Sequence, residues 1–178
     1  WSAKILKRMS HVARLARADI PHASRFSEGF FVHLTGFNQA FAAFQARSGG
    51  QQRMQMDPRA PSRSYLKTEE AFRIFGTEPH EGETVIDLGA APGGWSFSAL
   101  KRGARVTAVD NGPLKDPVRS HPNLVHLETD ALRYRHEHAR PADWLLCDII
   151  EKTEVILHLL QKWLNQRWCR NFIVNIKV

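Results

Sequence analysis

Cysteine is scarce in this chain of 178 residues, and long apolar runs are missing from it. The two cysteines, Cys147 and Cys169, are too few for a disulfide framework. No apolar stretch approaches the roughly 20 residues that a membrane-spanning helix needs. The hydrophobic fraction of 43% is nevertheless too high for intrinsic disorder. These features predict a soluble globular protein with reduced thiols, and a cytoplasmic location fits them best.

Acidic residues are nearly missing from the first third of the chain. Residues 1–67 hold 11 Lys and Arg but three acids, a net charge of +8, whereas residues 68–178 carry −1. Such an asymmetry is typical of a segment that meets a polyanion, because each phosphate that is neutralised releases condensed counterions. The alternative is a basic surface that contacts only solvent. We expect nucleic acid or another polyanion as the partner.

We expect residues 1–50 to form a basic N-terminal segment of mixed α+β character. In residues 1–17 apolar side chains recur at helical spacing opposite Lys and Arg, which predicts a basic amphipathic helix. In residues 29–47, apolar side chains recur at every second position on both sides of a turn-like stretch, which favours a β-hairpin, although residues 39–47 also fit a helix. Residues 51–63 contain three Gln and two Pro without periodicity, which predicts a linker.

Residues 64–178 alternate between expected strands and helices, which predicts an α/β domain with a mainly parallel, Rossmann-like sheet. The expected strands cover residues 84–88, 105–110, 123–128, 143–148 and 171–178, and the expected helices cover residues 65–75, 95–102 and 153–166. The chain opens at Trp1 without a Met and stops within the last expected strand. We therefore expect both ends to be cut and the sheet to be incomplete at its C-terminal side.

The most informative motif is a strand that runs through glycines into a helix, from Asp87-Leu88-Gly89-Ala90-Ala91 to Pro92-Gly93-Gly94-Trp95. Such a turn lets the backbone approach a ligand at the carboxyl edge of a sheet. A phosphate-binding P-loop would need Lys after its last glycine, where Trp95 stands. The dinucleotide fingerprint lacks its second glycine, because Ala91 occupies that position. A carboxylate above this turn suits a cationic nucleoside such as S-adenosylmethionine.

Two more acids follow the next expected strands. Asp110 lies 23 positions after Asp87 and could accept both hydroxyls of an adenosine ribose. Asp130 follows the third strand and is a candidate to bind the adenine amino group. Each acid alone could instead cap the helix after its strand. Because all three end successive strands, we expect them to share one cofactor pocket.

The glycine motif resembles the cofactor motif of the FtsJ-like ribose 2′-O-methyltransferases. Other stretches resemble the branch of this family that modifies a cytidine of 23S ribosomal RNA: Ala60-Pro61-Ser62-Arg63-Ser64 with Leu66-Lys67, Val109-Asp110-Asn111-Gly112-Pro113, Cys147-Asp148 with Glu151-Lys152, and Trp168-Cys169-Arg170. The resemblance covers about residues 57–178. It implies S-adenosylmethionine as cofactor and 23S ribosomal RNA as partner. It also implies that residues 1–50 end a THUMP-type RNA-binding region.

The resemblance assigns the cofactor site to matching positions of this sequence. They are Asp87, Gly89, Ala90, Pro92, Gly93, Gly94, Trp95, Asp110, Asp130 and Asp148. It also implies a Lys-Asp-Lys-Glu catalytic set, in which Lys67, Asp148 and Lys177 match the first three members. The Glu would lie beyond Val178.

This catalytic set is chemically reasonable, because a ribose hydroxyl is a poor nucleophile that gains from a base and from close alignment. A lysine acts as base only if its pKa falls from about 10.4 toward neutrality, which a second cation and partial desolvation favour. Lys177 is the expected base, Lys67 the neighbouring cation, and Asp148 the group that holds them. Singly, each is also an ordinary residue at the end of a helix or strand.

Other interpretations stay open. The chain could be an RNA-binding module that kept the fold without turnover, or a dinucleotide-dependent oxidoreductase. The nine histidines lack companions at metal-ligand spacing, so we expect no metal site. Cys147 could be a nucleophile for cytosine methylation, but its apolar neighbours favour a core position. Trp95 is a candidate to stack on a base.

Overall fold

The computed structural model describes residues 27–36, 39–46 and 54–176, and the chain divides into two compact units, residues 1–53 and 54–178. In the first unit, β1 (Ser27–Gly36) and β2 (Gln39–Ala46) form an antiparallel hairpin. The hairpin prediction is therefore confirmed over the helical alternative. The basic helix predicted for residues 1–17 lies outside the described residues.

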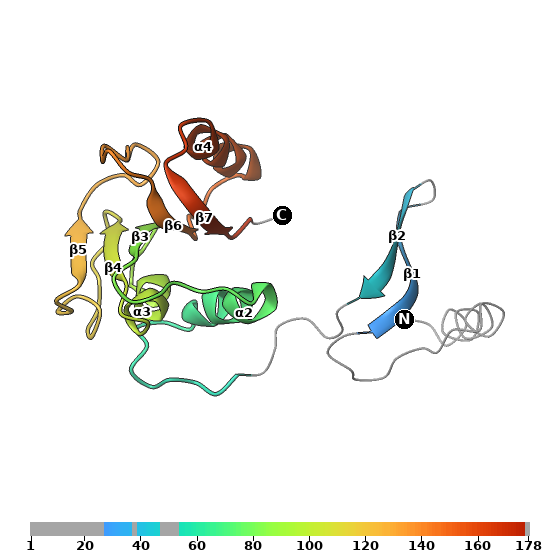
Figure 1. The fold of residues 1–178 in the computed structure, drawn as a ribbon, viewed down its shortest axis with the longest axis horizontal. Helices are drawn as coiled ribbons and strands as arrows, with labels where there is room; N and C mark the ends of the chain where they lie inside the picture. The colour runs from blue at the N-terminus through green and yellow to red at the C-terminus, as the bar shows by residue number, and fades with distance from the viewer. Residues whose placement is uncertain (1–26, 37–38, 47–53, 177–178) are drawn as a thin grey trace. The chain divides into compact units, whose positions relative to one another are not determined.

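The second unit contains a five-stranded sheet in the order β5-β4-β3-β6-β7, in which every neighbouring pair is parallel (Figure 1). The strands are β3 (Thr84–Leu88), β4 (Arg105–Val109), β5 (Leu124–Leu127), β6 (Ala142–Cys147) and β7 (Cys169–Val174). The predicted α/β fold with a parallel sheet is confirmed. The last strand begins two residues earlier than expected and ends at Val174.

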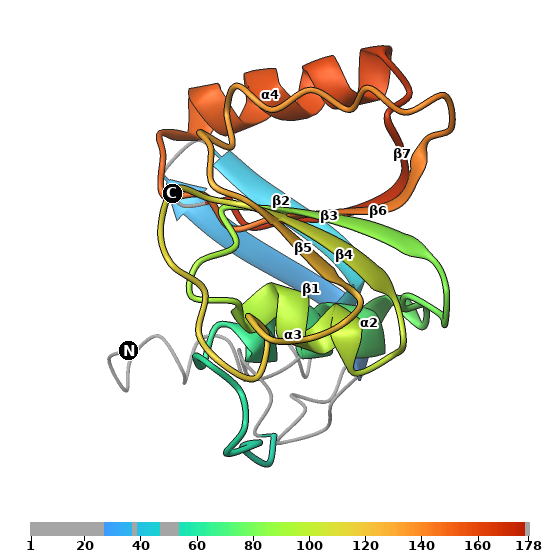
Figure 2. The same ribbon diagram turned by 90° about the vertical axis from the view of Figure 1, so that its left-hand side faces the viewer.

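Three helices cover the two faces of this sheet: α2 (Tyr65–Phe75), α3 (Gly94–Leu100) and α4 (Thr153–Asn165). Figure 2 shows α4 over one face and α2 with α3 over the other. Successive side chains of a strand point to opposite faces, so Trp144 and Leu146 of β6 pack toward α2 and α3, while Leu145 and Cys147 pack toward α4. Burial on both faces explains the continuous apolar run of β6. In the described part of the chain, no helix is long and apolar enough to cross a membrane.

Residues 54–63, which the sequence predicts to be part of a linker, pack against the rest of the second unit. Met54 and Ala60 lie against the core under α2 and α3. The Asp57 backbone N–H donates to the Tyr65 hydroxyl (2.6 Å), and the Asp57 carboxylate lies 3.4 Å from the Lys101 ammonium. Isolated residues, through a side chain or a backbone N–H, make these contacts, which explains why the segment shows no periodic pattern.

Candidate active site

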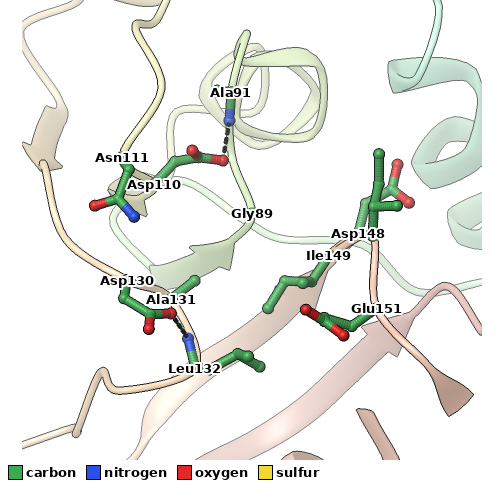
Figure 3. Close-up of a pocket in the computed structure, with 11 residues that line it drawn as sticks. Gly89, Ala91, Asp110, Asn111, Asp130, Ala131, Leu132, Asp148, Ile149 and Glu151 are labelled. Atoms are coloured by element: carbon green, nitrogen blue, oxygen red, sulfur yellow. Dashed lines mark hydrogen bonds between the residues drawn. The ribbon is translucent and has the colours of Figure 1, made fainter. Parts of the chain in front are cut away.

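The strand order places a topological switch between β3 and β6. The chain leaves β3 toward β4 on one side, and β6 lies on the other, so the chain continues from these two strands into helices on opposite faces of the sheet. Ligands of open α/β sheets bind in the crevice at such a point. A pocket of about 320 Å³ lies there (Figure 3). Its walls are Gly89, Ala91, Asp110, Asn111, Asp130, Ala131, Leu132, Asp148, Ile149, Ile150 and Glu151.

The pocket is acidic. Figure 3 shows Asp110 and Asp130 on one side of Gly89, and Asp148 and Glu151 on the other. Among the described residues, no Lys or Arg lines it. Like charges gathered in a concave site focus their potential inside it. The pocket therefore favours a cationic ligand over a phosphate-bearing one.

The glycine turn forms the floor of this pocket. Gly89 has φ of +77°, a conformation that side chains disfavour, and a Cβ built on it would lie 2.9 Å from Ile149 Cγ1. The Gly89 N–H donates to the Val109 carbonyl (3.0 Å), which ties the turn to the end of β4. The loops after β3 and β6 thus touch at a position that only glycine fits.

Asp110 is held rigidly at the pocket wall. Its Oδ2 accepts the Ala91 N–H (3.0 Å) and its Oδ1 accepts the Gly112 N–H (2.7 Å). Each carboxylate oxygen has about two acceptor sites, so one on each oxygen is left after these bonds. Asp110 can therefore still accept two ligand hydroxyls.

Asp130 also lines the pocket, and its Oδ1 accepts the Leu132 N–H (2.9 Å). Its Oδ2 lies 3.4 Å from Arg133 Nε. Asp130 thus binds a backbone N–H in a turn between β5 and β6, where the described chain has no helix, so it does not have the helix-capping role that the sequence left open as the alternative. Its position on the pocket wall is compatible with both this contact and cofactor binding.

Asp87 lies beneath the pocket rather than on its wall. It is fully buried, its Oδ2 accepts the Ser96 hydroxyl (2.7 Å), and its Oδ1 has no hydrogen-bond partner within the described residues. Burial raises the pKa of Asp87 to about 7, and the carboxylates of Asp148 and Asp110 act in the same direction. Asp87 therefore keeps a proton at pH values at which an exposed aspartate has lost it.

The other motif residues also form the turn under the pocket. Ala90, Gly93, Gly94 and Trp95 are buried, and none of them, nor Pro92, lines the pocket in the described structure. Trp95 is only 3% exposed, so its ring is not available to stack on a base. A direct contact of these residues with the cofactor stays a prediction.

The N-terminal end of α2 packs on the start of α3. A Cβ at Gly94 would collide with the hydroxyls of Ser62 and Ser64, which lie 2.6 Å from each other. Further along, the Thr68 hydroxyl donates to the Ser98 hydroxyl (2.9 Å). This close approach fixes the first turn of α2, and with it the backbone of Lys67.

The structure brings Lys67 and Asp148 together across 81 positions of sequence. Lys67 Nζ lies 2.9 Å from Asp148 Oδ2 and 3.2 Å from Oδ1. Lys67 is exposed between the buried residues Leu66 and Thr68, and Asp148 directly follows β6. Since Asp148 also lines the pocket, the ion pair lies at its edge. The third predicted catalytic residue, Lys177, lies outside the described residues.

Sequence reasoning missed Asn175. Its Nδ2 donates to Asp148 Oδ1 (2.7 Å), and its backbone N–H donates to the Cys147 carbonyl (2.9 Å). The available signal was its place just after the last strand, two residues before Lys177. Asn111 and Glu151, which line the pocket, were also missed as site residues.

The competing chemistries find little support in the side chains. No group of three or more His, Cys, Asp and Glu in the described ranges is placed to hold a metal ion. Cys147 is 1% exposed within the core cluster under α4, which confirms its core position. Burial raises the pKa of Cys169 to about 11, so its thiol stays protonated and unreactive at neutral pH.

Comparisons with known proteins agree with this geometry. The FtsJ-like methyltransferase family matches residues 60–172. Among curated proteins, ribosomal RNA large subunit methyltransferase M of Halorhodospira halophila is 42% identical, over 78% of this chain and 42% of that protein. The same protein of Laribacter hongkongensis is 43% identical, over 71% of this chain and 37% of that protein. The chain thus spans about two fifths of the length of these relatives.

A solved structure extends the comparison. A crystal structure described as that of a hemolysin from Lactococcus lactis is 26% identical, with a TM-score of 0.51, over 58% of this chain and 53% of that one. The family match is the more informative finding, since it spans more than half of the chain and includes the glycine turn, Lys67 and Asp148. This chain belongs to the FtsJ-like methyltransferase family.

Proposed function

We propose that this chain is the catalytic part of an S-adenosylmethionine-dependent enzyme that methylates a ribose 2′-hydroxyl in 23S ribosomal RNA. The observation that carries the proposal is the Lys67–Asp148 pair at the edge of an acidic pocket. The names of the curated relatives support ribosomal RNA as the substrate class. A cytidine as the target nucleotide and a cytoplasmic location are parts of the same proposal.

The pocket fits the proposed cofactor. S-adenosylmethionine, when bound, supplies an electrophilic methyl group on a sulfonium cation, and four carboxylates suit that charge. The remaining acceptor sites of Asp110 suit the ribose hydroxyls. Apolar side chains, among them Leu132 and Ile149, offer a surface for the adenine ring. A volume of about 320 Å³ lies in the usual range of small-molecule sites.

The same lining disfavours the oxidoreductase alternative. A dinucleotide carries a pyrophosphate, which would face four carboxylates without a Lys or Arg from the described lining to neutralise it. The glycine turn also lacks the second glycine of the dinucleotide fingerprint. Calorimetry separates the two functions: we expect S-adenosylmethionine to bind and NAD to give no heat.

Lys67 and Asp148 have distinct roles in the proposed reaction. The Asp148 carboxylate engages the Lys67 ammonium, so Lys67 is suited to hold charge and to orient the ribose rather than to remove a proton. We assign proton removal from the 2′-hydroxyl to Lys177, next to which Lys67 would act as the second cation. A general base contributes typically 10² to 10⁴ in rate.

The basic N-terminal third supports RNA as the partner. Residues 1–67 carry a net charge of +8, and their Lys and Arg are suited to contact phosphates. The RNA-binding module without turnover would use the same charges. The decisive experiment is therefore transfer of tritium from labelled S-adenosylmethionine to deproteinised large-subunit RNA by the full-length protein, followed by mapping of the modified nucleotide. Binding without transfer would support the module instead.

The assignment of the base has its own test. Lys177→Arg keeps the positive charge but cannot release a proton near neutral pH. We expect a single-turnover rate that is about 10² to 10⁴ lower, with cofactor and RNA affinities nearly unchanged. A rate within a few fold of wild type would show that position 177 supplies only a cation.

A further inference from the structure

We infer that Asn175 is a positioning residue for methyl transfer, whose side-chain amide holds the Asp148 carboxylate in the orientation that engages Lys67. The inference rests on the proposed function and adds a residue to its site. Asn175 is not among the residues that line the pocket, so it acts through Asp148 rather than on the cofactor.

The contact has one chemical interpretation. An ionised carboxylate is only an acceptor, so the Asn175 amide presents its NH₂ group to Asp148. Nδ2 lies 2.7 Å from Asp148 Oδ1, while Lys67 Nζ lies 2.9 Å from Oδ2. One donor comes from the end of β7 and the other from α2. Together these two donors fix the rotation of the Asp148 carboxylate about its Cβ–Cγ bond.

Backbone hydrogen bonds make this holding group rigid. The Asp148 N–H donates to the Leu88 carbonyl (3.2 Å), and the Asn175 N–H donates to the Cys147 carbonyl (2.9 Å). The residues that follow β6 and β7 are thus tied to the last residues of β3 and β6. The Asp148 side chain is only 13% exposed, so water replaces a lost donor poorly. The backbone hydrogen bond from Asn175 to Cys147 thus holds the side-chain amide of Asn175 next to Asp148.

The chemistry of asparagine fits the role better than that of a charged residue. A cation at position 175 would compete with Lys67 for the same carboxylate. An aspartate would place a second carboxylate beside Asp148, and two such groups share a proton rather than both ionise. A neutral donor orients Asp148 and leaves its negative charge to Lys67.

Two variants in the full-length protein test the inference. Asn175→Leu keeps the approximate size but removes the donor, and we expect its single-turnover rate to fall by about 10- to 100-fold, as misplacement of a catalytic group by about 1 Å does. S-adenosylmethionine affinity should change little, and the unfolding midpoint should fall only by the amount that one lost hydrogen bond accounts for. A rate within twofold of wild type would overturn the inference.

Asn175→Asp adds a readout that a merely structural role would not move. When protonated, the new carboxyl can donate to Asp148, and when ionised it repels Asp148. The rate of the variant, divided by the wild-type rate at the same pH, should therefore fall as the pH rises. A ratio that does not change with pH would contradict the role assigned to Asn175.

Amine labelling tests the same contact without catalysis. Lys67 and Lys101 are matched, since both pair with an aspartate and have similar side-chain exposures of 42% and 37%. In Asn175→Leu we expect faster labelling of Lys67, with Lys101 unchanged. Equal labelling of Lys67 in variant and wild type would overturn the inference. If Lys67 is labelled faster in Asn175→Leu than in wild type, but the wild-type protein transfers no methyl group, only the proposed function would be overturned.

Discussion

Two aspartates near the ends of strand β6, Asp143 within it and Asp148 directly after it, have opposite uses. Asp143 lies near the amino end of β6, where its Oδ2 accepts both the N–H and the hydroxyl of Thr84 (2.9 Å each) and its Oδ1 accepts from Arg170 (3.0 Å). Asp148 follows its carboxyl end, where its carboxylate accepts from the side chains of Lys67 and Asn175. Both carboxylates are ion-paired, but only Asp148 lines the acidic pocket.

The difference is in the partners. Thr84 belongs to the adjacent strand, and its hydroxyl also accepts the Asp143 N–H (3.1 Å). Thr84 and Asp143 therefore hydrogen-bond to each other in both directions, which links β3 to β6. Lys67 comes from a distant helix. A carboxylate bound only by residues of its own sheet stabilises the sheet, whereas one that also binds a lysine from a helix outside the sheet is available for chemistry. The comparison predicts that variants at the two ends separate activity from stability.

Asp148→Ala is expected to have the largest effect. It removes the group that orients Lys67, and we expect methyl transfer by the full-length protein to fall by about 10² to 10⁴, comparable to the loss of a catalytic group. The unfolding free energy should change little. Asp143→Ala is the matched control, since it removes the same side chain from the other end of the strand. Comparable rate losses in the two variants would break the distinction.

Asp110→Ala should weaken cofactor binding. Two ribose hydroxyls would lose a charged acceptor, a loss of about 1.5 to 3 kcal/mol in binding free energy. Isothermal titration of S-adenosylmethionine into the chain measures this directly. Unchanged affinity would leave Asp110 as a local fold residue that only binds the N–H groups of Ala91 and Gly112.

Asp87→Asn tests the buried end of the acidic region. The pKa of Asp87 is raised to about 7 by burial, above the ordinary 3.8 that holds in the unfolded chain. Between these values the folded protein binds more protons, so its unfolding free energy falls as the pH rises. We expect Asn, which keeps an acceptor for Ser96, to remove about 2 kcal/mol of this decline between pH 5 and 7. Urea unfolding at both pH values checks it, and an unchanged slope would contradict the raised pKa.

The fold was predictable because apolar periodicity records burial. The run of Trp144 to Cys147 indicated a strand covered on both faces, and the order of strands and helices indicated a parallel sheet. Strand limits were less accurate: β7 starts at Cys169, because backbone pairing with Ala142 fixes its start and no side-chain pattern records it. The packing of Met54 and Ala60 could not be predicted either, because two isolated apolar residues form no periodic pattern.

The site was partly predictable. Parallel strands bring their carboxyl ends to one edge, so Asp110 and Asp130 could be grouped from sequence alone, whereas Asp148 was assigned by the family resemblance. The sequence did not show which motif residues reach the pocket wall: Asp87 and Trp95 are buried beneath the pocket and do not line it. Nor did it reveal Asn175, since a neutral amide carries no charge pattern and its role depends on a single contact at 2.7 Å.

Asp143→Ala is expected to have the smallest effect, on stability alone. The backbone N–H of Thr84 holds the pKa of Asp143 below its usual range, helped by the Thr84 hydroxyl and by the charges of Arg170 and Arg105. The stability contribution of a lowered pKa is present above the unfolded-state value and is lost as the pH falls through the folded-state value. Loss of these hydrogen bonds should cost about 1 to 2 kcal/mol at pH 7.

The pH dependence makes this last prediction specific. The difference in unfolding free energy between wild type and Asp143→Ala should be constant from pH 8 to 5 and should shrink below about pH 4, where the unfolded carboxylate binds a proton. Asp87→Asn should show the opposite window, with its difference growing between pH 5 and 7. Urea titrations at four pH values measure both. If the two variants shared one window, the ends of the sheet would not differ in the way that their hydrogen bonds and burial require.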